Sequence, residues 1–171
     1  LCADEVAGVY TRGWALLNGR FIDGNPDTPG NPEMSLEVFE AAFIHEFGHM
    51  IGLDHSQINV NCLPFGLCGN SDLQGLPTMF PYLVSLEMAS LAPDDIAGVS
   101  ELYPEAGFAT STGRIRGRMF FSDGLTPAQG FNVVARRVDD PATTGVDESR
   151  TTAVSRVSGF LFTPDAGNPL V

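Results

Sequence analysis

All three histidines of this chain lie in one eleven-residue window, residues 45–55, which reads HEFGHMIGLDH. His45 and His49 are four residues apart, so on a helix their side chains project from one face, about one turn apart. Gly52 permits the left-handed turn that ends a helix, after which His55 returns to the same point. Three imidazoles leave one position of a tetrahedral Zn²⁺ open to water, which is typical of a catalytic zinc site. The window therefore predicts zinc ligands at His45, His49 and His55.

Glu46 follows the first of these histidines and borders the predicted metal without being required to bind it. The alternative is that unrelated histidines happen to cluster. For a chain of this composition the full pattern arises by chance about once in 10⁵ chains, which favours the metal site.

Two helices are predicted, and the first carries the window. Ser35 is a suitable N-cap for a helix that ends near Gly52. Its apolar positions recur at helical spacing and predict a wide core-facing stripe of Val38, Phe39, Ala42, Phe43, Phe47, Met50 and Ile51. A second helix is expected from about Pro93, with Asp94 and Asp95 as capping carboxylates rather than catalytic groups.

The remaining segments are predicted to be extended or irregular. Residues 6–23 are expected to form one hairpin or two strands, and 24–33 a turn-rich loop. Residues 56–92 are expected to be mostly irregular because they are rich in Asn, Gly, Pro and Ser. After Gly107 four short alternating runs predict strands, at residues 113–121, 130–138, 150–157 and 159–162.

Charge divides the chain into two parts. The net charge is −12, and all nine basic residues are Arg. Residues 1–107 carry two Arg and fifteen carboxylates, whereas residues 108–171 carry seven Arg and six carboxylates. We therefore predict a domain boundary near Gly107.

An acidic surface repels phosphate and anionic lipid, so neither nucleic acid nor membrane is expected as a partner.

The window resembles the zinc-binding motif of the metzincin clan of zinc endopeptidases. Residues 77–81, PTMFP, match the Met-containing turn that these enzymes have beneath the zinc, which implies that role for Met79; ordinary core packing is the alternative. Ser56 and residues 91–103, LAPDDIAGVSELY, are similar to the matrixins, the matrix metalloproteinase-like subgroup. In matrixins a similar Asp pair holds the mature N-terminus or the active-site base.

This resemblance implies an α+β fold over residues 1–107. The expected parts are a twisted sheet, a zinc-binding active-site helix, a Met-turn and a C-terminal helix. The first helix and the early strands of such a domain are missing here, so we expect the chain to be a fragment of a larger protein. Residues 108–171 resemble the opening strands of a carboxypeptidase-regulatory-like β-sandwich, C-terminally incomplete; a generic β module is the alternative.

The resemblance and the zinc chemistry together imply a secreted zinc-dependent endopeptidase that hydrolyses peptide bonds of proteins. A zinc-activated water would attack the bond, with Glu46 as general base. Protein or peptide substrate is expected to lie along an edge strand near residues 14–18, with residues 80–86 shaping the pocket past the cleaved bond. The alternatives are another metzincin subgroup and a non-catalytic surface or adhesion protein with a vestigial zinc site. Retention of Glu46 favours the enzyme.

Two weaker features complete the expectations. Cys62 and Cys68 bracket a short loop and are predicted to form a disulfide, which implies an extracellular location; three unpaired thiols are the alternative. Cys2 is then left to pair with a segment outside the chain. Asp23, Asn25 and Asp27 alternate in a loop and offer oxygen ligands for Ca²⁺, although a solvated turn is the alternative and the EF-hand pattern fails.

Overall fold

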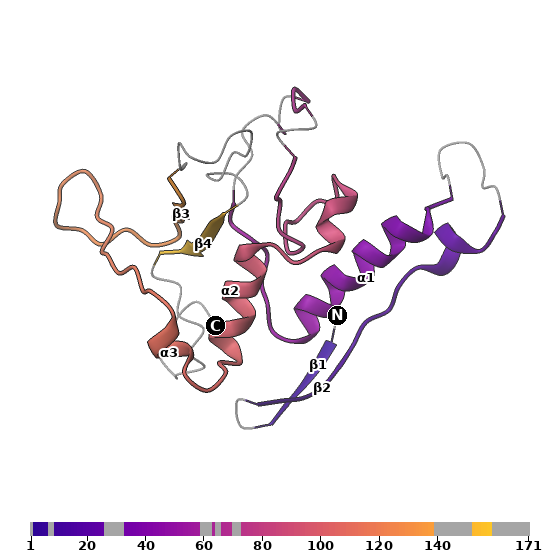
Figure 1. Ribbon diagram of the computed structural model, residues 1–171, viewed down its shortest axis with the longest axis horizontal. Coiled ribbons are helices and arrows are strands. Elements are labelled where there is room, and N and C mark those ends of the chain that lie inside the picture. The colour runs from indigo at the N-terminus through magenta and orange to yellow at the C-terminus, as the bar shows by residue number, and fades with distance from the viewer. Residues whose placement is uncertain are drawn as a thin grey trace.

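The computed structural model describes residues 2–6, 9–25, 33–58, 63, 66–69, 73–138 and 152–158. Its elements in chain order are β1 (Cys2–Val6), β2 (Val9–Trp14), η1 (Gly19–Ile22), α1 (Leu36–Met50), η4 (Leu86–Ala89), α2 (Pro93–Leu102), α3 (Phe108–Ser111), β3 (Asn132–Arg136) and β4 (Ala153–Val157). The strands form two separate antiparallel pairs, β1 with β2 and β3 with β4 (Figure 1). The described chain is thus a mixed helix-and-sheet structure, which confirms the α+β class at this coarse level. None of the helices in these ranges is long and apolar enough to cross a membrane.

Helix α1 begins and ends where the sequence predicts. The Ser35 hydroxyl accepts a hydrogen bond from the Val38 N–H at 3.4 Å, which satisfies one of the free amides of the first turn. At the other end Gly52 has a φ of +95°, and the Leu53 N–H donates to the Gly48 carbonyl at 3.0 Å. A residue with a Cβ is disfavoured in this left-handed conformation, so Gly52 allows the chain to reverse after α1.

The predicted apolar stripe of α1 does not all face the core. Phe43 is 51% exposed and Phe47 50% exposed, and the buried residues of α1 are Ala41 and Gly48. Among the described elements, α1 packs mainly against η4. The prediction that Phe43 and Phe47 are buried is therefore wrong for the described chain, because no described element covers these two rings.

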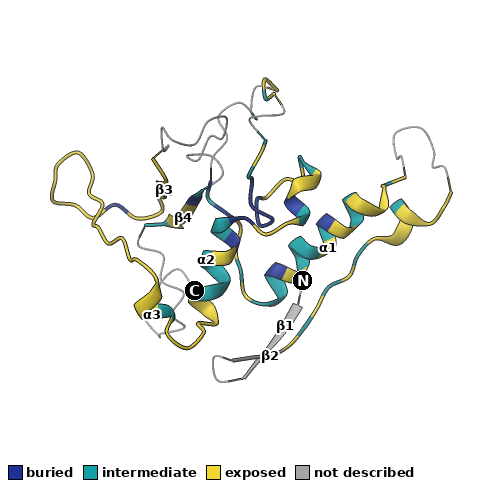
Figure 2. Cartoon of the chain, in the orientation of Figure 1, coloured by how far each residue is buried: buried dark blue, intermediate teal, exposed yellow. Residues whose placement is uncertain are grey.

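The buried core lies in the middle of the molecule, between α1 and β4 (Figure 2). One apolar cluster of this core contains the buried residues Ile58, Leu76, Phe80, Met88 and Ala153. Ala153 comes from β4, and Val134 of β3 packs against the same cluster. The hairpin β3–β4 therefore shares its apolar contacts with residues that precede Gly107. The domain division at this residue stays a prediction.

The extended segment at the start of the chain is shorter than predicted. Strand β2 ends at Trp14, and residues 19–22 form the 3₁₀ turn η1. The Asn18 side chain accepts a hydrogen bond from the Arg20 N–H at 3.1 Å, which caps this turn. This local cap stabilises a 3₁₀ turn where the sequence pattern predicts an extended strand. The prediction of strand through residue 23 is therefore wrong.

The predicted strands after Gly107 have different outcomes. Strands β3 and β4 confirm the runs at 130–138 and 150–157, and they pair antiparallel with Val134 opposite Ser155. Residues 113–119 have no regular structure, and Phe120 forms only an isolated bridge with Pro127. Because no described strand pairs with this segment, its backbone gains no ladder of hydrogen bonds. The run at 159–162 lies outside the described residues.

Candidate metal centre

The structure brings the three histidines of the window together. His45 and His49 lie on α1, and His55 lies on the loop that follows the Gly52 turn. One ring nitrogen from each residue lies within 4.8 Å of the others. The Nε2 atoms of His49 and His55 are 3.2 Å apart. Two ligands of a tetrahedral zinc ion, each about 2.0–2.1 Å from the metal, are about 3.3 Å from one another, so this spacing fits such an ion.

Backbone carbonyls orient two of these rings. The Nδ1 of His45 lies 2.7 Å from the Thr78 carbonyl oxygen, and the Nδ1 of His49 lies 2.9 Å from the Leu53 carbonyl oxygen. A carbonyl oxygen only accepts, so each Nδ1 carries the proton and donates it. In the neutral imidazole the Nε2 then keeps a lone pair directed at the shared point. This arrangement of outer contacts is typical of metal-binding histidines.

The electrostatics of His55 also suit a ligand. Desolvation is the main cause that lowers the pKa of His55, and the neighbouring His49 and His45 lower it further. The carboxylates of Asp54 and Glu46 oppose this shift. A lowered pKa favours the neutral imidazole, which is the form that binds a metal.

Glu46 lies beside the histidine cluster on α1. Its side chain is half-buried, and its charge acts on His55. Within the described ranges its carboxylate has no hydrogen-bond or ion-pair partner, so both oxygens are open to accept a proton. The general-base role of Glu46 stays a prediction.

Met79 lies directly against the turn of α1 that joins the first two histidines. It is 3% exposed, and its Sδ is the atom nearest to the position that a β-carbon on Gly48 would occupy. Its carbonyl oxygen accepts a hydrogen bond from the Ser56 N–H at 2.8 Å, next to the third histidine. Met79 therefore contacts both the helix and the loop that carry the three rings.

Asp95 binds the backbone of the turn that contains Met79. Its buried carboxylate accepts three backbone hydrogen bonds, from the N–H groups of Thr78 at 2.9 Å, Met79 at 2.9 Å and Ala92 at 2.8 Å. The contact with Ala92 is the helix-capping role that the sequence predicts for Asp95. Its hold on Thr78 and Met79 was not predicted. No local signal identifies these contacts, because the bonded residues are 17 and 16 positions away in the chain.

The remaining predicted sites receive less support. Cys62 and Asp27 lie outside the described residues, so the Cys62–Cys68 disulfide stays a prediction. Asp23 accepts a hydrogen bond from the Asn25 N–H at 2.8 Å, which is typical of a turn. Among the described residues, the histidine trio is the one group of at least three potential ligands close enough to share an ion. A Ca²⁺ site at the 23–27 loop is therefore not supported by the part that is described.

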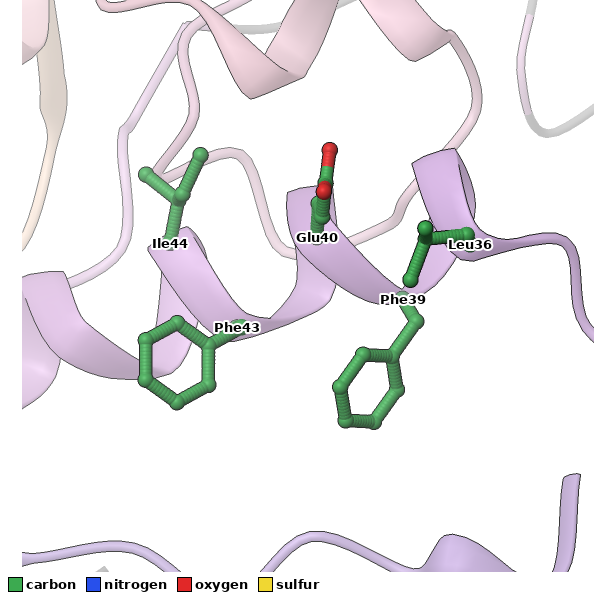
Figure 3. Close-up of a pocket in the computed structure, with 5 residues that line it drawn as sticks. All are labelled: Leu36, Phe39, Glu40, Phe43 and Ile44. Carbon is green, nitrogen blue, oxygen red and sulfur yellow. The ribbon is translucent and has the colours of Figure 1, made fainter. Parts of the chain in front are cut away.

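The segments predicted to contact substrate differ in part from the prediction. Residues 15–18 have no regular structure, so the expected edge strand ends at Trp14, which is exposed. Phe80 is buried in the core, whereas Tyr82 and Leu86 are exposed. A separate pocket on α1 is lined by Leu36, Phe39, Glu40, Phe43 and Ile44, with the two phenylalanine rings on one side of the helix (Figure 3). None of the three histidines lines it.

No family model, curated protein or solved structure matches the chain. The resemblance to the metzincins therefore rests on the sequence motifs alone.

Proposed function

We propose that this chain is part of a secreted, matrixin-like zinc endopeptidase. In this proposal residues 1–107 form part of a metzincin catalytic domain, and residues 108–171 begin a carboxypeptidase-regulatory-like β-sandwich. One observation carries the proposal: ring nitrogens of His45, His49 and His55 lie within 4.8 Å of one another, and Glu46, whose carboxylate has no hydrogen-bond or ion-pair partner within the described ranges, is close enough for its charge to act on His55. A structural metal site has no need of a free carboxylate at this position.

The roles of the residues follow from their chemistry. His45, His49 and His55 would hold Zn²⁺ through neutral imidazoles, two of them oriented by the carbonyls of Thr78 and Leu53. A bound Zn²⁺ would lower the pKa of a water molecule and would polarise the carbonyl group of the substrate. Glu46 would take a proton from the attacking water at a carboxylate oxygen and would later deliver it to the leaving amine. Met79 and Asp95 support the helix and loop that carry the ligands.

A protein substrate in extended form suits the described sheet. Strand β2 pairs with β1 on one side, and no other described strand pairs with it. An extended peptide can add to such an edge through main-chain hydrogen bonds. Because these bonds do not involve the side chains of the peptide, many sequences can bind in this way. We therefore propose that substrate binds along β2 near Trp14, the point where the strand ends.

The decisive experiment replaces Glu46 by Gln in the purified protein. Gln keeps the shape of the side chain but does not accept the proton, so we expect hydrolysis of an unstructured protein substrate to fall about 10²–10⁴-fold. Zinc content, measured by elemental analysis, should not change. The matched control is Glu40→Gln, an identical substitution on the exposed part of α1, which should leave the rate unaltered.

Two results would contradict the proposal. Full activity in zinc-loaded Glu46→Gln would show that the base is another group. A wild-type protein that binds zinc but cleaves no protein substrate would instead favour a surface or adhesion protein with a vestigial site.

A further inference from the structure

The third histidine is held differently from the other two. His45 and His49 are spaced by the backbone hydrogen bonds of α1, whereas His55 lies five residues beyond the end of that helix. Its position therefore depends on how the following residues, 56–58, are anchored. One anchor is the hydrogen bond from the Ser56 N–H to the Met79 carbonyl. The other anchors come from side chains.

These side-chain anchors join the loop to α2 and to β4. The Asp94 Oδ2 accepts a hydrogen bond from the Ser56 hydroxyl at 2.5 Å and one from the Ser155 hydroxyl at 2.8 Å. The Asp94 Oδ1 accepts from the Ser155 N–H at 2.6 Å. The Ser155 Oγ in turn accepts from the Gln57 N–H at 2.9 Å. Each hydroxyl donates its single proton to the carboxylate, so the donors and acceptors of this network balance.

Gln57 completes the path back to the ligand. Its side-chain Nε2 donates to the His55 carbonyl oxygen at 3.0 Å, while its backbone N–H is held by Ser155. A movement of the Ser155 side chain would therefore move Gln57, and through Gln57 the backbone of His55. The rings of His45 and His49 are also hydrogen-bonded, to the Thr78 and Leu53 carbonyl oxygens, but the backbone of both residues is held by α1.

The hairpin gives Ser155 a defined position. In β4 it lies two residues from the buried Ala153, and successive side chains of a strand alternate in direction, so both face the core. Strand β4 lies beside the N-terminal end of α2, where Asp94 is found (Figure 1). The next residue of the strand, Arg156, forms an ion pair with Glu101 of α2.

We propose that Ser155 is a positioning residue for the third metal ligand. In this proposal the hairpin β3–β4 supports the candidate metal centre, because it holds the loop that carries His55. This inference rests on the proposed function for the identity of the metal. It assigns Ser155 no direct role in catalysis.

The test measures zinc release rather than hydrolysis. Zinc-loaded protein is mixed with excess chelator, and the rate of metal loss is compared among wild type, Ser155→Ala, Ser155→Thr and Ser158→Ala. Loss of outer contacts to metal ligands typically lowers affinity about 10–100-fold, so for this more distant contact we expect about tenfold faster release from Ser155→Ala. Ser155→Thr keeps the hydroxyl and suits a strand, so it should restore the wild-type rate.

Ser158→Ala is the matched control. The Ser158 hydroxyl also makes one donated and one accepted hydrogen bond, to the Ala128 carbonyl and from the Phe131 N–H, but it does not contact the loop. It should release zinc like wild type. A second measurement, hydrogen exchange of the Gln57 amide in the metal-free protein, should be faster in Ser155→Ala alone.

The outcomes separate this inference from the proposed function. Equal release rates for all four proteins would overturn it, and so would faster release from Ser155→Thr or Ser158→Ala. A wild type that binds no zinc would overturn both proposals. Zinc binding without peptidase activity would overturn only the proposed function and leave the positioning role in place.

Discussion

The Sδ of Met79 lies 2.2 Å from the point where a β-carbon on Gly48 would be. Real β-carbons essentially never come within 3.0 Å of another heavy atom, so only glycine fits at this position of α1 while Met79 stays in place. Gly48 precedes His49, and the Met79 carbonyl holds Ser56 next to His55. The close contact therefore sets the distance between the helix and the loop that carry the three histidines.

Gly48→Ala should destabilise the protein despite the better helix propensity of alanine. The propensity gain is about 1 kcal/mol, whereas overpacking a buried site typically costs about 1–3 kcal/mol. We expect a net loss in the free energy of unfolding, measured by urea denaturation. Gly19→Ala is the control, because a β-carbon there meets no atom within 4 Å. A Gly48→Ala protein as stable as wild type would show that Met79 moves aside freely.

Asp95→Ala should be among the most damaging substitutions outside the histidine cluster. It leaves the N–H groups of Thr78, Met79 and Ala92 without their acceptor in a buried region. Each unsatisfied buried group costs about 1–3 kcal/mol, so we expect a loss of about 3 kcal/mol or more in the free energy of unfolding.

Asp123→Ala is the matched control for Asp95. The Asp123 carboxylate also accepts two backbone hydrogen bonds, from Leu125 and Thr126, but it is exposed, and water can replace it. Urea denaturation should therefore show a change of about 0.5 kcal/mol or less. Equal effects of the two substitutions would contradict the role given to Asp95.

Zinc removal should lower stability as well as abolish activity. A ligand that binds only the folded state adds about 4 kcal/mol when its free concentration is 1,000 times its Kd. We therefore expect one zinc per chain by elemental analysis after dialysis, a lower melting temperature after chelation, and recovery when zinc is returned. A well-folded protein without zinc, or with another tightly held metal, would refute the assignment.

The Cys62–Cys68 disulfide should form in the native protein. The loop between the two residues is short, so the bond constrains little of the unfolded chain and should add about 2 kcal/mol or less. Mass spectrometry of peptides digested without reduction should recover the two residues cross-linked. Alkylation of both thiols in the unreduced protein would exclude the disulfide and remove the cysteine argument for secretion.

Local signals predicted the ligand-bearing helix well. The Ser35 cap, the helical spacing of His45 and His49, and the Gly52 turn all depend on residues within a few positions of one another. The same reasoning failed for Phe43 and Phe47. Their helical spacing is correct, but spacing alone does not show which element covers a face of the helix, and no described element covers these rings.

The sequence by itself determined which side chains form the candidate metal centre and where α1 begins and ends. Both follow from contacts within one or two turns of backbone, for which the order of residues is sufficient. Only the tertiary structure decided what supports the centre: Asp95 on the amides beside Met79, and Ser155 on the amide of Gln57. These partners are 16 and 98 residues apart in the chain. They meet because the core brings α2 and β4 against the same loop, and no local pattern records which distant surfaces will pack together.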